Sequence, residues 1–136
     1  MTTEYSKIQS ALNHHLSTMV GKPDVVAYEN LTVSPPESEL YLILRFKPDE
    51  PDYPDVGISA KAFESGIFQC VSAALPGSGW GLAYNQADNI MERFKQGVVI
   101  NHNDINVRIL LSYPGPGIIQ DGRYQVPVNI RYFGYY

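Results

Sequence analysis

Hydrophobic residues recur at helical spacing in two stretches of the chain. Residues 3–19 open with residues that favour a helix start and then place apolar side chains three and four positions apart, until Gly21 and Pro23 end the pattern. The second stretch runs over residues 83–94, and Gly97 follows it as a stop. Each pattern predicts an amphipathic helix that buries one side in a core.

Runs of bulky apolar residues predict strands in the rest of the chain. The expected strands span residues 25–28, 40–46, 67–75, 98–100, 105–113 and 124–132. Within residues 105–113, alternate residues from Ile105 through Leu111 to Tyr113 are expected to face the core. Pro127 favours a sheet edge or a bulge for the last strand. The order of elements indicates an α+β fold, with two helices packed on one face of a mostly antiparallel sheet.

A proline-rich, acidic segment separates two of these strands. It spans residues 47–66 and contains Pro48, Pro51, Pro54, Asp49, Glu50, Asp52 and Asp55. Proline removes donors from a β-ladder, and neighbouring like charges repel one another. We therefore expect a long, exposed, extended arm within a single domain over residues 1–136, because 136 residues is close to the commonest domain size.

Net charge and cysteine content narrow the class of protein. Ten Lys and Arg residues against fourteen Asp and Glu residues give a net charge of −4, opposite to that expected of a protein that grips phosphates. We expect no sequence-specific nucleic-acid binding. Cys70 is the single cysteine and lies in an apolar run, which predicts a buried thiol in a reducing cytosol. No leader and no membrane span are expected.

The residue types that catalyse reactions or bind metal ions are not grouped into a recognisable motif in the sequence. The adjacent His14 and His15 project about 100° apart on a helix, and His102 is expected to lie remote from them in a polar turn. No nucleophile motif is present, and the apolar neighbours of Cys70 raise the pKa of a thiol. We therefore expect no catalytic residue, no metal site and no cofactor.

A glycine-rich stretch precedes the second helix. Residues 77–81 read Gly-Ser-Gly-Trp-Gly, and backbone amides at the start of a helix bind anions. The stretch lacks the lysine of a phosphate-binding P-loop, so a strand-to-helix connection is the simpler interpretation. A small anion-binding α+β domain remains as an alternative.

Three segments stand in a distinctive order. They are residues 66–71 leading to Pro76-Gly77-Ser78-Gly79, residues 83–94, and residues 113–128. In the last of them Asp121 and Gly122 supply a positive-φ turn that is expected to let the last two long strands pair. In this order and spacing the segments resemble the small tail-terminator proteins of long-tailed bacteriophages, over nearly the whole chain.

The resemblance implies a structural role rather than an enzymatic one. Such a protein assembles as a ring, usually a hexamer, on the last ring of the tail tube, where it stops polymerisation and presents a surface to the head. The implied partners are further copies of itself, the tail-tube protein and a head-completion or connector protein. The implied location is the head-proximal end of the tail, after synthesis in the host cytoplasm. A different neck or connector component remains as a second possibility.

We expect the sheet face away from the helices, or the arm, to supply lateral contacts between copies. The strand over residues 40–46 is bulky on both faces, and aromatic residues crowd the C-terminus, where they are expected to dock. The candidate interface residues are Tyr41, Ile43, Arg45, Asp49, Glu50, Asp52, Tyr53, Asp55, Tyr135 and Tyr136.

Overall fold

The protein combines two helices with a curled sheet. The computed structural model describes residues 5–29, 34–36, 39–50 and 64–135. The helices are α1 (Tyr5–Ser17) and α2 (Gly81–Arg93). The strands are β1 (Val26–Ala27), β2 (Tyr41–Pro48), β3 (Glu64–Ala74), β4 (Val99–His102), β5 (Ile105–Pro114), β6 (Ile118–Gln120) and β7 (Arg123–Tyr135).

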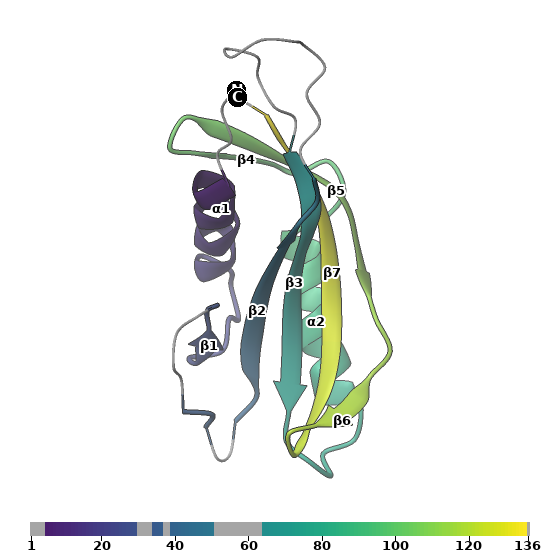
Figure 1. Ribbon diagram of the computed structural model, residues 1–136. Coiled ribbons are helices and arrows are strands. Elements are labelled where there is room, and N and C mark those ends of the chain that lie inside the picture. Colours follow the sequence, from purple (N-terminus) through teal and green to yellow (C-terminus); the bar gives the residue numbers. More distant parts are fainter. Residues whose placement is uncertain (1–4, 30–33, 37–38, 51–63, 136) are drawn as a thin grey trace.

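The sheet holds its strands in the order β1-β2-β3-β7-β5-β4, and β6 pairs with one end of β7. β1 runs parallel to β2, and the other pairs are antiparallel. Figure 1 shows α2 running along β3 and β7, and α1 near β4. α1 packs on β4 and β5, and also touches α2. The expected α+β class, with two helices on a mostly antiparallel sheet, is confirmed.

The core lies between the helices and one face of the sheet. From α1 and α2 the buried residues follow three- and four-residue spacing: Ile8, Ala11, Leu12, Leu16, Ala83, Ala87 and Ile90. They meet the alternate residues of β7, namely Val126, Val128, Ile130 and Tyr132, all of which are fully buried. These periods of 3.6 and 2 are the ones that the sequence predicts. Cys70 is buried in the same core, as expected.

A bulge in β5 reverses which side chains face the core. Ile109 is opposite Tyr132, but Leu111 is already opposite Arg131, so Leu110 is an extra residue in the ladder. One extra residue moves every later side chain to the other face. The predicted core positions of Leu111 and Tyr113 are therefore wrong, because both side chains are exposed on the face away from the helices.

Pro127 lies in an interior strand, so the expected edge position is wrong. β7 has β3 on one side and β5 and β6 on the other. The carbonyl of Pro127 accepts a hydrogen bond of 2.7 Å from Gly115 N. A residue of an extended strand directs its N and its carbonyl to the same side, so the missing N–H faces the break between β5 and β6. Proline is tolerated there because the ladder beside β7 is already interrupted between β5 and β6.

Both ends of the predicted arm belong to the sheet instead. Residues 47–48 continue β2, residues 64–66 begin β3, and Asp49 N donates to Ser65 O at 2.8 Å. The ladder continues up to Pro48, which has no N–H to donate. Residues 51–63 of the predicted arm lie outside the described residues.

The two helices are joined near their C-terminal ends by reciprocal hydrogen bonds. His15 Nε2 donates to Arg93 O at 2.9 Å, and Arg93 Nε donates to His15 O at 2.9 Å. His15 borders the core and His14 is exposed, as expected. His102 is not remote from them, because its ring stacks on that of His14 with centroids 4.6 Å apart.

We expect acid to destabilise this junction through His15. Burial, and to a smaller extent the charges of Arg93 and His14, lowers the pKa of His15 from 6.5, although the bond to the Arg93 carbonyl opposes the shift. The unfolded chain then takes up the proton more readily than the folded one. The stability contributed by neutral His15 is complete above pH 6.5 and is lost as the pH falls through the lower folded pKa.

The measurement is the thermal unfolding midpoint between about pH 7.5 and about pH 5. His15→Gln keeps a donor but does not titrate, so its midpoint should fall less over this interval than that of the wild type. His14→Gln removes the neighbouring imidazole and should keep most of the fall, because burial is the main cause of the lowered pKa of His15 and the charge of His14 is a minor one. An equal fall in wild type and His15→Gln would contradict the assignment.

Candidate functional site

The sheet face away from the helices, called the outer face below, is left uncovered over much of its area. The strand register sets its side chains in rows across β2, β3, β7 and β5. One row contains Arg45, Gln69, Asn129 and Tyr113. The next row contains Lys47, Ile67, Arg131 and Leu111. Of the residues predicted for an interface, Ile43 and Arg45 lie on this face.

The outer face is positively charged although the chain is acidic. Arg45, Lys47, Arg108 and Arg131 lie on it and are exposed. Within the described strands, no carboxylate shares these rows. The nearest acid is Asp49, just beyond β2, whose Oδ2 lies 3.8 Å from Arg131 Nη1. The net charge of −4 is therefore unevenly distributed, and this face attracts anionic groups.

A shallow cavity of about 180 Å³ lies on the outer face. It is lined by two cations, three glutamines and three apolar residues: Arg45, Lys47, Gln69, Gln120, Gln125, Val71, Ile118 and Pro127. Across the face Gln69 Nε2 donates to Asn129 Oδ1 at 3.0 Å. The lining pairs positive charge with amides and apolar surface, a combination that suits a peptide with carboxylate and apolar side chains.

Arg123 closes one end of the outer face. Its guanidinium carbon lies 5.1 Å above the Tyr41 ring, and the same group donates to the carbonyls of Glu39 (2.7 Å) and Pro36. Tyr41, a predicted interface residue, is buried under it. Ile43 is half-buried, so Arg45 is the most accessible of the three predicted β2 residues.

The other predicted interface residues are only partly described. Asp49 and Glu50 are exposed at the end of β2. Asp52, Tyr53, Asp55 and Tyr136 lie outside the described residues. The backbone of Tyr135 belongs to β7 and pairs with Asn106. Of these residues, Asp49 is the one that contacts the described outer face, through its ion pair with Arg131.

The turn predicted at Asp121 and Gly122 is confirmed, with φ angles of 52° and 72°. The strands that it connects are not the two long ones. It joins the short strand β6 to β7, and the long strand β5 pairs with β7 on the other side of the break at residues 115–117.

Sequence reasoning did not select Lys47, Arg108 or Arg131 for the site. The available signal was the two-residue spacing of Arg45 and Lys47, since residues two apart in a strand share a face.

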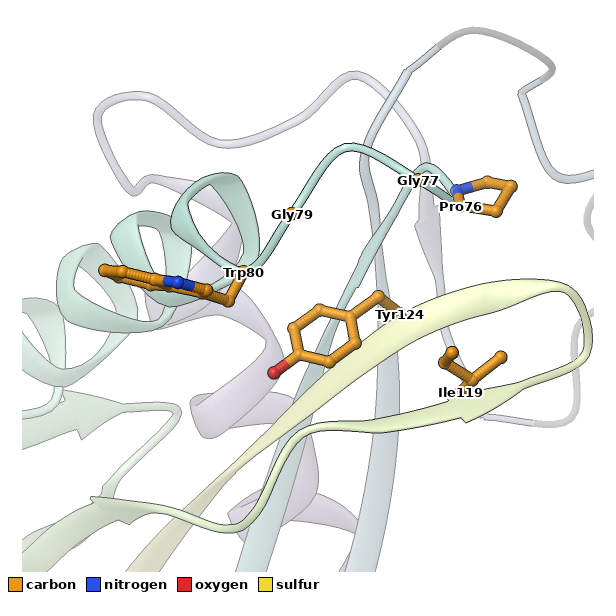
Figure 2. Close-up of a pocket in the computed structure, with 6 residues that line it drawn as sticks. All are labelled: Pro76, Gly77, Gly79, Trp80, Ile119 and Tyr124. Carbon is orange, nitrogen blue, oxygen red and sulfur yellow. The ribbon is translucent and has the colours of Figure 1, made fainter.

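A second cavity, of about 350 Å³, lies between the turn that precedes α2 and the β6–β7 hairpin. Figure 2 shows its lining: Pro76, Gly77, Gly79, Trp80, Ile119 and Tyr124. Gly77 and Gly79 have φ angles of +77° and +80°, which permit the tight connection. No charged side chain lines this cavity. It offers room to an apolar group and gives no support to the anion-binding alternative.

We expect phosphate to leave this cavity unaffected. Trp80 is the single tryptophan of the chain and is 70% exposed, so its fluorescence reports on the cavity. Phosphate added at constant ionic strength should change neither the Trp80 emission nor the thermal unfolding midpoint. A midpoint that rises with phosphate beyond a sulfate control would favour the anion-binding alternative.

The described residues offer little for catalysis. They contain no group of three or more His, Cys, Asp or Glu side chains placed to hold a metal ion. Burial raises the pKa of the Cys70 thiol. The His14 and His102 rings stack at 17°, so the two imidazoles lie face to face. None of the helices in the described part of the chain is long and apolar enough to cross a membrane.

The fold, two helices on a mostly antiparallel sheet with one accessible face, places the chain among α+β proteins. A family model described as phage tail terminator protein matches residues 7–132, and the chain belongs to this family. The resemblance seen in the sequence is thereby confirmed. The protein is a non-enzymatic component of the phage tail.

Two further comparisons complete the picture. No curated protein sequence matches the chain. A solved structure superposes with a TM-score of 0.74 at 20% sequence identity, covering 99% of this chain and 98% of that one. At this identity the match shows a shared fold.

Proposed function

We propose that the protein caps the tail tube as a ring, in the assembled tail a hexamer, and so ends tube polymerisation. The ring then presents a surface to a head-completion or connector protein at the head-proximal end of the tail. Family membership supports this role over that of another neck component. The structural observation that supports it best is the largely uncovered outer face, because a protein that works by association needs an accessible surface.

The lateral contact between copies is assigned to the outer face and to the acidic segment that follows β2. These are two different surfaces of one chain, so a contact between them is heterologous. Heterologous contacts generate rings when the rotation closes. Ile43, Arg45, Asp49 and Glu50 are the described residues assigned to this contact, and Asp52, Tyr53 and Asp55 continue the segment in the sequence.

The test is to add the purified protein to polymerising tail-tube protein and to image the tubes. Capped ends and arrested growth support the role. Tubes that grow to the same length with and without the protein would refute it.

A variant tests the acidic segment separately. It replaces residues 51–62 with a short flexible linker, which keeps the Asp49–Ser65 bond and the buried Glu64. Unchanged ring assembly by light scattering would exclude the segment from the contact.

A further inference from the structure

We propose that the apolar cavity between the turn before α2 and the β6–β7 hairpin is the surface by which the protein docks on the tail-tube protein. The occupant is an apolar or aromatic side chain presented by the last ring of the tube. The inference rests on the proposed capping role and names the tube-facing surface in it. Three features of the cavity support it: its exposed apolar side chains, its braced walls and its place in the fold.

Large apolar side chains at the cavity are left in water by the fold. Trp80 is 70% exposed and Ile119 is 80% exposed, and Leu82 in the first turn of α2 is exposed as well. A tryptophan has up to about 250 Å² to bury, so most of the contact area of Trp80 is still open. No charged side chain lines the cavity. An exposed, uncharged group of this kind marks a contact with an apolar partner surface.

The two aromatic walls of the cavity are braced within the chain. The Trp80 ring meets that of Tyr84 edge to face, with centroids 6.3 Å apart. Gly117 leaves room for the Tyr124 ring, because a Cβ at position 117 would overlap the Tyr124 hydroxyl. Figure 2 shows Tyr124 between Trp80 and Ile119. A cavity of about 350 Å³ with walls already in place needs little ordering when a side chain enters it.

The cavity lies away from the surfaces assigned to contacts between copies. Tyr124 packs against the core on the helix side of the sheet, opposite to the outer face. The cavity is also at the end of the sheet where Ala74 is opposite Tyr124, whereas Asp49 bonds Ser65 at the other end. Nine steps along β3 separate Ser65 from Ala74, which is about 30 Å. Figure 1 shows this separation, with β6 at one end of the sheet and β4 at the other.

The size of the apolar group favours a ring-on-ring contact over the pairing of two copies. A stable pair of proteins buries about 800 Å² on each side, and three partly exposed side chains offer less than that. A cap repeats the contact in every subunit, so contacts that are weak singly act together. The tube ring is the partner that repeats in the same way, and membership of the tail-terminator family implies an interaction with it.

The test removes apolar surface at the cavity without touching the core. The cavity variant carries Trp80→Ala and Ile119→Asp, at two exposed positions. Val20→Asp is the matched control, because Val20 is 93% exposed and lies on the turn after α1, outside the cavity lining. Circular dichroism and the unfolding midpoint show that each variant is folded, and light scattering compares its oligomeric state with that of the wild type.

The cavity variant should cap growing tubes at least about tenfold less well than the wild type, because a tryptophan buried on docking dominates a contact of this size. Its oligomeric state should equal that of the wild type, and Val20→Asp should cap normally. Normal capping by the cavity variant would overturn the proposal. A changed oligomeric state would also overturn it, because the cavity would then belong to a contact between copies.

A second measurement follows Trp80 without changing the surface by mutation. Trp80 is the single tryptophan of the chain, so 5-hydroxytryptophan incorporated there can be excited selectively in the presence of tube protein. Acrylamide should quench its fluorescence several-fold less once tubes are added. Capped tubes on which this residue stays open to acrylamide would refute the docking contact alone. Tubes that protect it but keep growing would support the contact and refute the capping role, and tubes that do neither would refute both.

Discussion

Phe94→Ala should lower the free energy of unfolding by about 3–5 kcal/mol, the largest effect expected of a single core truncation in this chain. Phe94 follows α2 and is fully buried. Its ring centroid lies 5.8 Å from that of Phe68 on β3 and 5.0 Å from that of His15 on α1. One side chain thus fills the space where both helices meet the sheet, and its removal leaves a cavity that three elements border.

Urea unfolding followed by circular dichroism measures the effect. A domain of this size has about 5–15 kcal/mol of stability, so the variant should unfold at a much lower urea concentration. Phe94→Leu keeps most of the volume and should cost less than about 1.5 kcal/mol. A loss below about 1 kcal/mol for Phe94→Ala would show that the helices pack on the sheet without this anchor.

The main elements of the fold could be predicted because each rests on a local pattern. The spacing of Ile8, Leu12 and Leu16 marks α1, and the alternation from Val126 to Tyr132 marks β7, whatever their partners. The errors fall where pairing between strands decides the outcome. The bulge at Leu110 and the ladder break beside Pro127 depend on which strands lie next to β7. A single sequence contains no direct record of that order.

The residues of the candidate site also divide into those that a local pattern predicts and those that depend on the order of the strands. Arg45 could be selected from its own strand, because bulky residues on both faces of β2 indicate that the second face is covered as well, which predicts a contact there. Arg108 and Arg131 could not, because they join Arg45 and Lys47 only through the β2-β3-β7-β5 order. The same two-sided pattern predicts Tyr41 as an interface residue, but Arg123, 82 positions later in the chain, covers it. Contacts between residues so far apart need the register that the structure supplies.

Gly66→Ala should destabilise the protein by about 2–3 kcal/mol, through overpacking rather than through backbone conformation. A methyl group on Gly66 would lie 2.5 Å from Lys47 O, 2.7 Å from Tyr132 Oη and 2.8 Å from Pro48 Cα. Two of these three atoms belong to the β2 backbone, so strand pairing itself must shift. Gly81→Ala is the matched control, because a methyl group there meets no atom within 4 Å.

A double-mutant cycle separates the contributions of side chain and backbone. Tyr132 is opposite Gly66 and stacks on Phe46, and its buried hydroxyl has no hydrogen-bond partner among the described residues. Tyr132→Phe alone should therefore change stability little, and in the Gly66→Ala background it should recover only part of the loss. Full recovery would contradict a backbone clash. Since Gly66 is paired with Pro48, a shift here also displaces the adjoining Asp49–Arg131 ion pair. Gly66→Ala should then weaken tube capping more than its loss of stability alone explains, whereas Gly81→Ala should leave capping intact.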